Sequence, residues 1–140
     1  MARLLLIRHA PTPDTGHRLT GRLPGVSLGE EGRALAEKLA QRLADVRLDA
    51  VYSSPIERTW ETAEIVARPH GLQPIGDDGL LEVDFGDWSG RTFKQLQRLK
   101  LWQTVKTTPS RVTFPGGEAM ADMQRRAVAT CERLASGSPK

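Results

Sequence analysis

The feature that most constrains the fold is an apolar run near the N-terminus, Arg3–Ile7, which is followed at once by Arg8 and His9. The run is continuous rather than alternating, which is typical of a strand covered on both faces, as in a parallel sheet. Parallel strands need long crossover connections, usually helices, so the run predicts an α/β chain. The two basic side chains would then emerge at the mouth of the sheet, where such folds bind ligands.

Strand-like and helix-like segments alternate along the rest of the chain. Ser27 and Ser54 each stand three residues before a glutamate, a capping-box spacing that predicts a helix start at both places. The predicted strands cover residues 49–54 and 72–79, and the predicted helices cover a segment after Ser27 and residues 54–67, 92–106 and 118–134. This alternation favours a three-layer α/β/α sandwich with a mostly parallel sheet. At 140 residues we expect one domain over residues 1–140.

Composition narrows the classes of partner. The formal net charge is +3, but lysines and arginines are scattered, so no nucleic-acid-binding patch is predicted. The basic excess suits a small anionic partner, such as a phosphorylated substrate. A single cysteine, Cys131, rules out a disulfide within the chain and is typical of a reducing compartment. No apolar run is long enough for a membrane and no residue cluster has metal-ligand spacing, so we expect a cytoplasmic protein without membrane contact, metal or other cofactor.

Four residues are candidates for chemistry. Arg8 beside His9 at a sheet mouth favours a bound anion, although a histidine alone would more often be a satisfied strand-edge residue. Arg58 falls in the first turn of a helix, where the dipole disfavours a cation. It either pairs with nearby glutamates at the surface or binds a phosphate together with the helix N-terminus. Glu82 has apolar neighbours on both sides, which suits a general acid, but an ordinary loop carboxylate explains it equally well.

Five segments, in order along nearly the whole chain, carry a resemblance to a known family. They read LLLIRHAPT, RLTGRLPGVSLGEEGR, AVYSSPIERTWETAEIVA, LLEVDFGDWSG and FPGGEAMADMQRRA. These segments resemble the signature blocks of the histidine phosphatase superfamily, which has the phosphoglycerate-mutase-like fold. The third segment is similar to the block Ser-Ser-Pro-x-x-Arg-x-x-x-Thr-Ala, and the fourth to Leu-x-Glu-x-x-Phe-Gly-x-Trp-x-Gly.

The resemblance implies a metal-independent phosphatase that hydrolyses phosphate monoesters. His9 would be the nucleophile that forms a phosphohistidine, and Arg8 and Arg58 would bind the phosphoryl oxygens. Glu82 would protonate the leaving alkoxide and then activate water. The resemblance also implies substrate contacts at Thr15, Thr20 and Gly21. A covalent intermediate and arginine clamps suit this reaction, because phosphate monoesters are among the slowest compounds to hydrolyse without a catalyst.

The chain departs from the family pattern at several positions. Ala10 stands where the family has glycine, Pro11 where it has glutamate, and Ala119 where it has serine. The family also carries a second phosphate-binding histidine on a strand after its last helix, but the chain ends at Lys140, where that strand should begin. We therefore expect a C-terminally truncated domain that lacks the last strands.

Two alternatives to a phosphatase follow from the same resemblance. The mutase branch typically has Glu-Arg-His-Tyr-Gly at the acid, and this chain has Glu82-Val-Asp-Phe-Gly86, which favours a phosphatase over a phosphoglycerate-mutase-type phosphotransferase. Without the second histidine, the chain could instead be a non-catalytic module that binds phosphate or a phosphoprotein. The resemblance leaves the substrate and the oligomeric state open.

Overall fold

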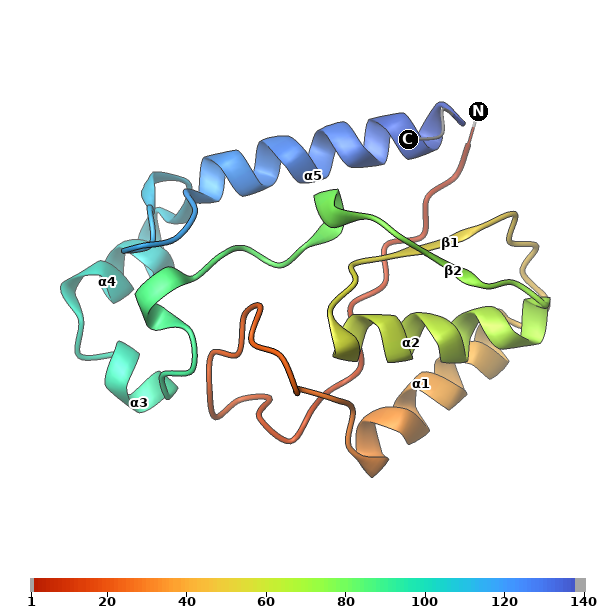
Figure 1. Ribbon diagram of the computed structural model, residues 1–140, viewed down its shortest axis with the longest axis horizontal. Coiled ribbons are helices and arrows are strands. Elements are labelled where there is room, and N and C mark those ends of the chain that lie inside the picture. Colours follow the sequence, from red (N-terminus) through yellow and green to blue (C-terminus); the bar gives the residue numbers. More distant parts are fainter. Residues whose placement is uncertain (1, 138–140) are drawn as a thin grey trace. The chain divides into compact units, whose positions relative to one another are not determined.

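The computed structural model describes residues 2–137, and the chain divides into two compact units. The His9 unit comprises Ile7–Thr15 and Pro24–Leu81. The Glu82 unit comprises Met1–Leu6, Gly16–Leu23 and Glu82–Lys140. Figure 1 shows the elements of both units. Among residues 2–137, no helix combines the length and the apolar character needed to cross a membrane.

The His9 unit is built on a strand–helix–strand motif. Its helices and strands, in chain order, are α1 (Glu30–Leu43), β1 (Val51–Ser53), α2 (Glu57–Ala67), the 3₁₀ turn η1 (Arg68–His70), β2 (Pro74–Gly76) and the 3₁₀ turn η2 (Asp78–Leu80). The strands β1 and β2 are parallel neighbours, with Val51 opposite Pro74 and Ser53 opposite Gly76, and α2 connects them (Figure 1). This parallel pair with its crossover helix confirms the predicted α/β class.

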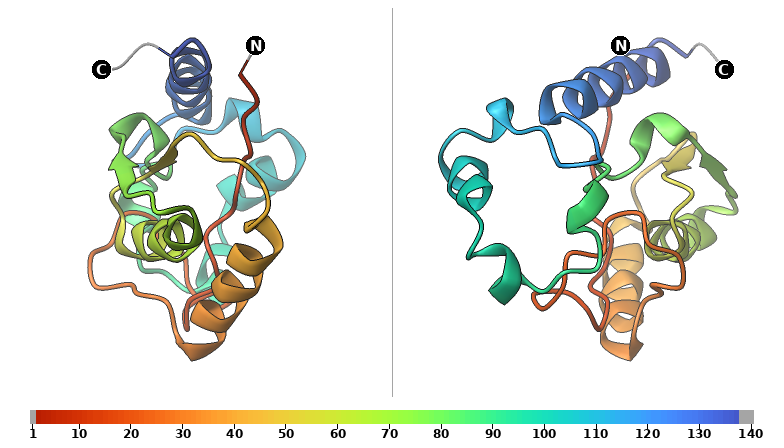
Figure 2. Two further views of the ribbon diagram at one scale, coloured as in Figure 1. Left: turned by 90° about the vertical axis from the view of Figure 1, so that its right-hand side faces the viewer. Right: turned by 60° about the vertical axis from the view of Figure 1, so that its left-hand side comes forward.

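Small residues let α1 lie close to α2 and to the segment after His9. Ala36 and Ala40 of α1 are almost fully buried in a cluster with Ala10, Leu28 and Ile65. The two helices lie side by side in every view (Figure 2). A Cβ atom on Gly32 would lie 2.0 Å from the carbonyl oxygen of Pro11, so glycine is required at this point of α1. The loop that follows His9 therefore rests directly on α1.

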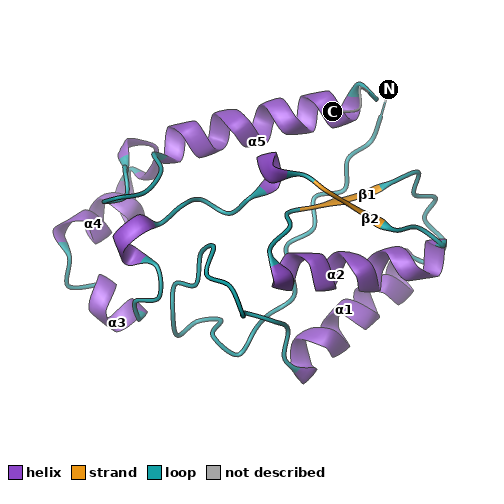
Figure 3. Ribbon diagram, in the orientation of Figure 1, coloured by secondary structure: helices purple, strands orange, loops and turns teal. Residues whose placement is uncertain are grey.

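Aromatic side chains form the core of the Glu82 unit. Its elements are the 3₁₀ turn η3 (Gly86–Trp88), α3 (Phe93–Leu96), α4 (Lys100–Thr107), the 3₁₀ turn η4 (Pro109–Arg111) and α5 (Met120–Ala135) (Figure 3). Trp88 and Phe114 are 3 % exposed and meet edge to face, with ring centroids 5.3 Å apart. Val83, Leu96 and Val112 complete this buried cluster. Val83 directly follows Glu82, so the core fixes the chain next to a candidate site residue.

The prediction of a strand at residues 3–7 is wrong. Residues 3–7 form no strand, and their side chains are exposed, with Leu6 at 84 %. A strand exists only where a neighbour completes its hydrogen-bond ladder, and no segment among residues 2–137 pairs with this run. The apolar pattern thus indicates burial that the described residues do not supply.

The predicted helix starts are displaced. The N-caps of α1 and α2 are Gly29 and Ile56, and neither helix start has a capping hydrogen bond from a side chain. Ser54 Oγ instead accepts the N–H of Ile56 at 3.4 Å, a turn that delays the helix by two residues. The helix expected over 92–106 is divided into α3 and α4, although Thr92 and Gln95 do form a capping box. The last helix begins at Met120 rather than at residue 118.

Candidate active site

His9 and Arg58 lie together in the His9 unit. Nε2 of His9 accepts a hydrogen bond from Nε of Arg58 at 3.3 Å, and Nδ1 lies 2.7 Å from the carbonyl oxygen of Ala10. A guanidinium can only donate and a carbonyl can only accept, so these contacts assign the proton to Nδ1 and the lone pair to Nε2. His9 is therefore held as the neutral imidazole whose Nε2 can act as a nucleophile.

Buried hydrogen bonds from α2 fix the position of this pair. The N–H of Ala10 donates to Oγ1 of Thr62 at 3.1 Å, and that hydroxyl donates to the carbonyl oxygen of Arg58 at 2.7 Å. All three residues are at most 7 % exposed. The peptide after His9 is thus bonded to the helical turn that carries Arg58, and Thr62 positions it. Thr62 was not among the predicted site residues, although it is the threonine of the block Ser-Ser-Pro-x-x-Arg-x-x-x-Thr-Ala, which is the sequence signal for it.

The burial of Arg58 argues against the interpretation as a surface ion pair. Its side chain is only 3 % exposed, so it is not a solvated surface cation. The carboxylate of Glu61, one of the glutamates considered as a surface partner, accepts from Arg33 at 2.7 Å and from the N–H of Leu28 at 3.2 Å. A buried guanidinium in contact with His9 is the arrangement expected of an anion-binding residue.

Arg8 and Thr15 belong to the same unit and are both exposed. Arg8 directly precedes His9 in the chain. Oγ1 of Thr15 accepts the N–H of Thr12 at 2.9 Å, and the N–H of Thr15 donates to the carbonyl oxygen of Thr12 at 3.0 Å. Within the chain, Thr15 therefore closes a turn in the loop after His9.

Glu82, Thr20 and Gly21 belong to the Glu82 unit. Gly21 is buried with a φ of +53°, and a Cβ there would lie 2.8 Å from the ring of Phe85. The loop of Thr20 and Gly21 thus packs against the segment that carries Glu82. Glu82 is half-buried, and its Oε1 accepts the N–H of Val83 at 2.9 Å.

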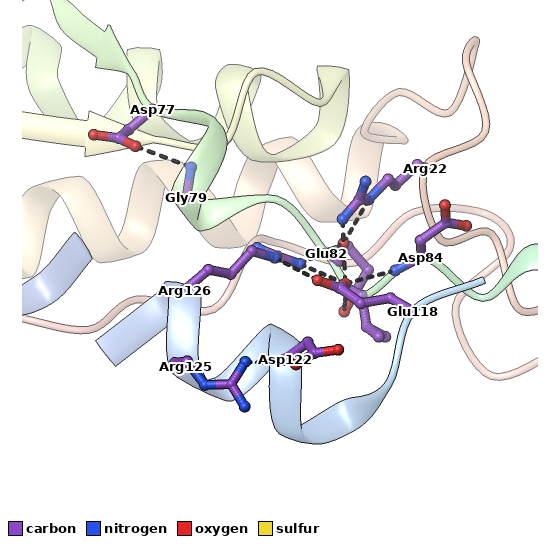
Figure 4. Close-up of polar contacts among 10 residues, drawn as sticks. Arg22, Asp77, Gly79, Glu82, Asp84, Glu118, Asp122, Arg125 and Arg126 are labelled. Carbon is purple, nitrogen blue, oxygen red and sulfur yellow. Dashed lines mark hydrogen bonds and ion pairs between the residues drawn. The ribbon is translucent and has the colours of Figure 1, made fainter. Parts of the chain in front are cut away.

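Two arginines that the sequence analysis did not select contact Glu82 (Figure 4). The carbonyl oxygen of Glu82 accepts from Nε of Arg22 at 2.7 Å and from Nη2 of Arg126 at 3.2 Å. The apolar neighbours in the sequence suggested a dry surrounding for this residue. In the structure, Val83 lies in the buried core, and Arg22 and Arg126 donate to the backbone carbonyl oxygen of Glu82.

The two arginines share a carboxylate, Glu118. Oε1 of Glu118 accepts from Nε of Arg126 at 2.8 Å, and Oε2 accepts from Nη2 of Arg126 at 2.9 Å and from Arg22 at 3.3 Å. Hydrogen bonding to Arg126 lowers the pKa of Glu118, and the same bond raises the pKa of Arg126. Glu118 lies in the segment FPGGEAMADMQRRA, whose helix-entry pattern was the only sequence signal for it.

Close backbone contacts hold the segment after Glu82 against residues 115–118. The N–H of Asp87 donates to the carbonyl oxygen of Pro115 at 2.8 Å, and the N–H of Glu118 donates to that of Asp84 at 2.8 Å. A Cβ on Gly117 would lie 2.3 Å from the carbonyl oxygen of Asp84. Glycine is therefore required for this approach. Among residues 2–137, no cluster of His, Cys, Asp and Glu could hold a metal ion.

Comparison with known families identifies what the sequence blocks resemble. The family model described as "Histidine phosphatase superfamily (branch 1)" matches residues 4–140. Phosphoserine phosphatase 1 of Hydrogenobacter thermophilus is 34% identical over 134 residues, which cover 90% of this chain and 61% of that protein. Phosphoglycerate mutase-like protein 4 of Arabidopsis thaliana is 29% identical over 139 residues, which cover 95% of this chain and 60% of that protein.

Solved structures show the same fold. The mycobacterial glucosyl-3-phosphoglycerate phosphatase matches with a TM-score of 0.79 at 28% identity, covering 91% of this chain and 61% of that one. The Bacillus stearothermophilus protein YhfR matches with a TM-score of 0.84 at 30% identity, covering 92% of this chain and 65% of that one. The chain thus spans about three-fifths of the length of these relatives.

Proposed function

The chain belongs to the histidine phosphatase superfamily (branch 1), and from that premise we propose that it hydrolyses small phosphate monoesters through a phosphohistidine on His9. One observation carries the proposal. His9 is a neutral imidazole with its proton on Nδ1 and its Nε2 directed at the buried guanidinium of Arg58. A lone pair beside a fixed cation is what attack on a phosphoryl group requires, because the cation attracts the phosphoryl oxygens.

In the first step, Nε2 of His9 attacks phosphorus and the bond from phosphorus to the leaving oxygen breaks. The electron pair of that bond stays on the leaving oxygen, which takes the proton of the Glu82 carboxyl. Arg8 and Arg58 bind the phosphoryl oxygens, whose charge spreads as the bond breaks. The bond from Nδ1–H to the carbonyl oxygen of Ala10 stabilises the positive imidazole ring that results.

In the second step, water attacks the phosphohistidine. The Glu82 carboxylate takes a proton from the water, the bond between phosphorus and Nε2 breaks, and its electron pair returns to Nε2. The products are an alcohol and inorganic phosphate, and Glu82 has regained its proton. Thr15, Thr20 and Gly21 contact the rest of the substrate.

A phosphatase is favoured over a phosphotransferase by the acid segment, in which Glu82 is followed by Val-Asp-Phe-Gly. Two relatives are named as phosphatases, for phosphoserine and for glucosyl-3-phosphoglycerate, and both support a small phosphorylated substrate here. A phosphotransferase would pass the phosphoryl group to a second hydroxyl compound. Product analysis with an added alcohol acceptor separates the two reactions.

The test is transfer of radiolabelled phosphate to the protein, together with release of p-nitrophenol from its phosphate ester. We expect an acid-labile label on the wild type and none on His9→Ala. Glu82→Gln should keep the label, because p-nitrophenol leaves with little help from an acid. It should lose turnover, because no carboxylate then takes the proton from the water that attacks the phosphohistidine. The matched control is His17→Ala, since the side chain of His17 is exposed. A wild-type protein that neither takes the label nor releases p-nitrophenol, but retains a bound phosphate, would be a binding module instead.

A further inference from the structure

We propose that Arg22, Arg126 and Glu118 act as positioning residues that set the orientation of the Glu82 carboxyl. The inference rests on the proposed role of Glu82 as proton donor. Residues 81–85 belong to no helix or strand, so no regular hydrogen-bond ladder holds Glu82. Its orientation must come from the contacts that other residues make to this segment.

The peptide bond between Glu82 and Val83 links the arginines to the carboxyl group (Figure 4). Its oxygen accepts from Arg22 at 2.7 Å and from Arg126 at 3.2 Å, which occupies both lone pairs of the carbonyl. Its N–H, on the other side of the same plane, donates to Oε1 of Glu82 at 2.9 Å. Because a peptide unit is planar, the two guanidinium groups that fix its oxygen also fix the N–H that holds the carboxyl.

Glu118 holds the two arginines in turn. It binds Arg126 through two parallel hydrogen bonds, a geometry that fixes the plane of the guanidinium as well as its distance. It also accepts from Arg22 at 3.3 Å and from the N–H of Asp84 at 3.2 Å. The carboxylate is only 17% exposed, so water competes weakly for it.

The network therefore contacts the segment after Glu82 at two points. The arginines bind the peptide immediately after Glu82, and Glu118 binds the N–H of Asp84, two residues further on. Loss of one member would let the 82–83 peptide rotate and carry the carboxyl with it. A displacement of about 1 Å is enough to reduce proton transfer by about 100-fold.

Leaving-group dependence separates this role from a general effect on folding. Protonation of the leaving oxygen matters greatly for an alkyl phosphate and little for p-nitrophenyl phosphate, whose leaving group is a weak base. We expect Arg126→Ala and Glu118→Gln to lose about 10- to 100-fold in kcat/KM on O-phosphoserine, and less than about threefold on p-nitrophenyl phosphate. Arg22→Ala should show the same pattern more weakly, since Arg22 makes one bond to Glu118 where Arg126 makes two.

The neighbouring residue Arg125 provides the matched control. It lies on the same helix, is 75% exposed, and pairs with Asp122 at 2.6 Å. Arg125→Ala should leave both substrates unaffected. Equal losses on the two substrates, or no loss on either, in Arg126→Ala and Glu118→Gln would overturn the positioning role.

A second readout does not depend on turnover. In the free protein, Arg126→Ala and Glu118→Gln should shift the Val83 amide resonance and speed its hydrogen exchange, whereas Arg125→Ala should change neither. An unchanged Val83 amide overturns the positioning role whatever the activity. If the wild type shows no turnover but the Val83 amide changes in the two variants as expected, the result would count against the proposed function and not against the positioning role.

Discussion

Replacing Glu118 with glutamine gives the prediction that follows most directly from the geometry. The substitution keeps the size of the side chain but removes the charge that Arg126 and Arg22 share. Exposed ion pairs contribute about 0–1 kcal/mol and hydrogen bonds to charged groups about 1.5–3 kcal/mol. Glu118 is 17% exposed and Arg126 24% exposed, which places the pair between these cases. We therefore expect Glu118→Gln to lose about 1–2 kcal/mol of unfolding free energy at neutral pH.

The loss should depend on pH in a direction that the pKa shift determines. Because the pKa of Glu118 is lowered in the folded protein, chiefly by hydrogen bonding to Arg126, the unfolded chain takes up the proton first as pH falls. The contribution of Glu118 is thus complete above its unfolded pKa, about 4.3, and disappears as pH falls through the folded value. The difference in stability between the wild type and Glu118→Gln should shrink over that range.

Thermal unfolding followed by circular dichroism between pH 7 and pH 3 measures this difference. A change of about 1–2 kcal/mol corresponds to a Tm lower by about 3–7 °C at pH 7 for a chain of this size. Asp122→Asn is the control, because Asp122 is 57% exposed in its pair with Arg125 and should change Tm little. Two Tm curves that run parallel from pH 7 to pH 3, or a Glu118→Gln variant as stable as the wild type at pH 7, would mean that the charge of Glu118 does not stabilise the fold.

Two further predictions concern the His9 unit. Gly32→Ala should destabilise the protein by about 1–3 kcal/mol in denaturant unfolding, because its Cβ would lie 2.0 Å from the carbonyl oxygen of Pro11; an unchanged midpoint would mean that α1 does not approach this loop. Thr62→Val should cost about 1–3 kcal/mol and slow phosphorylation of His9, because it leaves the buried N–H of Ala10 without its acceptor; a normal rate of phosphorylation would contradict the positioning role of Thr62.

Local patterns in the sequence predicted the elements that local physics determines. The strands at β1 and β2 and the helix α2 follow from hydrophobic periodicity and from turn residues at their ends. The run Arg3–Ile7 was predicted as a strand and is not one. A strand forms only when a second segment hydrogen-bonds to it, and the apolar pattern of one segment does not show whether such a partner exists. The start of α2 was misplaced because Ser54 bonds to Ile56 rather than to the first helical turn.

Only some of the residues of the candidate site were predicted from the sequence. His9, Arg58 and Glu82 were found because their residue types suit phosphate chemistry and their segments resemble a family. The structure brings two of them, His9 and Arg58, into direct contact across 49 residues of chain. Arg22 and Glu118 escaped notice because they meet across 96 residues of chain, and no local pattern reports such a pair. Thr62 belongs to the block that also holds Arg58, but its bond to the N–H of Ala10 spans 52 residues and could not be predicted from that block.

Phosphorus NMR of the phosphorylated protein tests whether His9 forms a phosphohistidine through Nε2. The proton on Nδ1 is directed at the carbonyl oxygen of Ala10, so only Nε2 has a lone pair to offer. We predict a phosphorus resonance of the Nε2-linked isomer, assigned to the His9 peptide by mass spectrometry at alkaline pH. Phosphate on Nδ1, or on any residue other than His9, would mean that Nε2 of His9 is not the nucleophile.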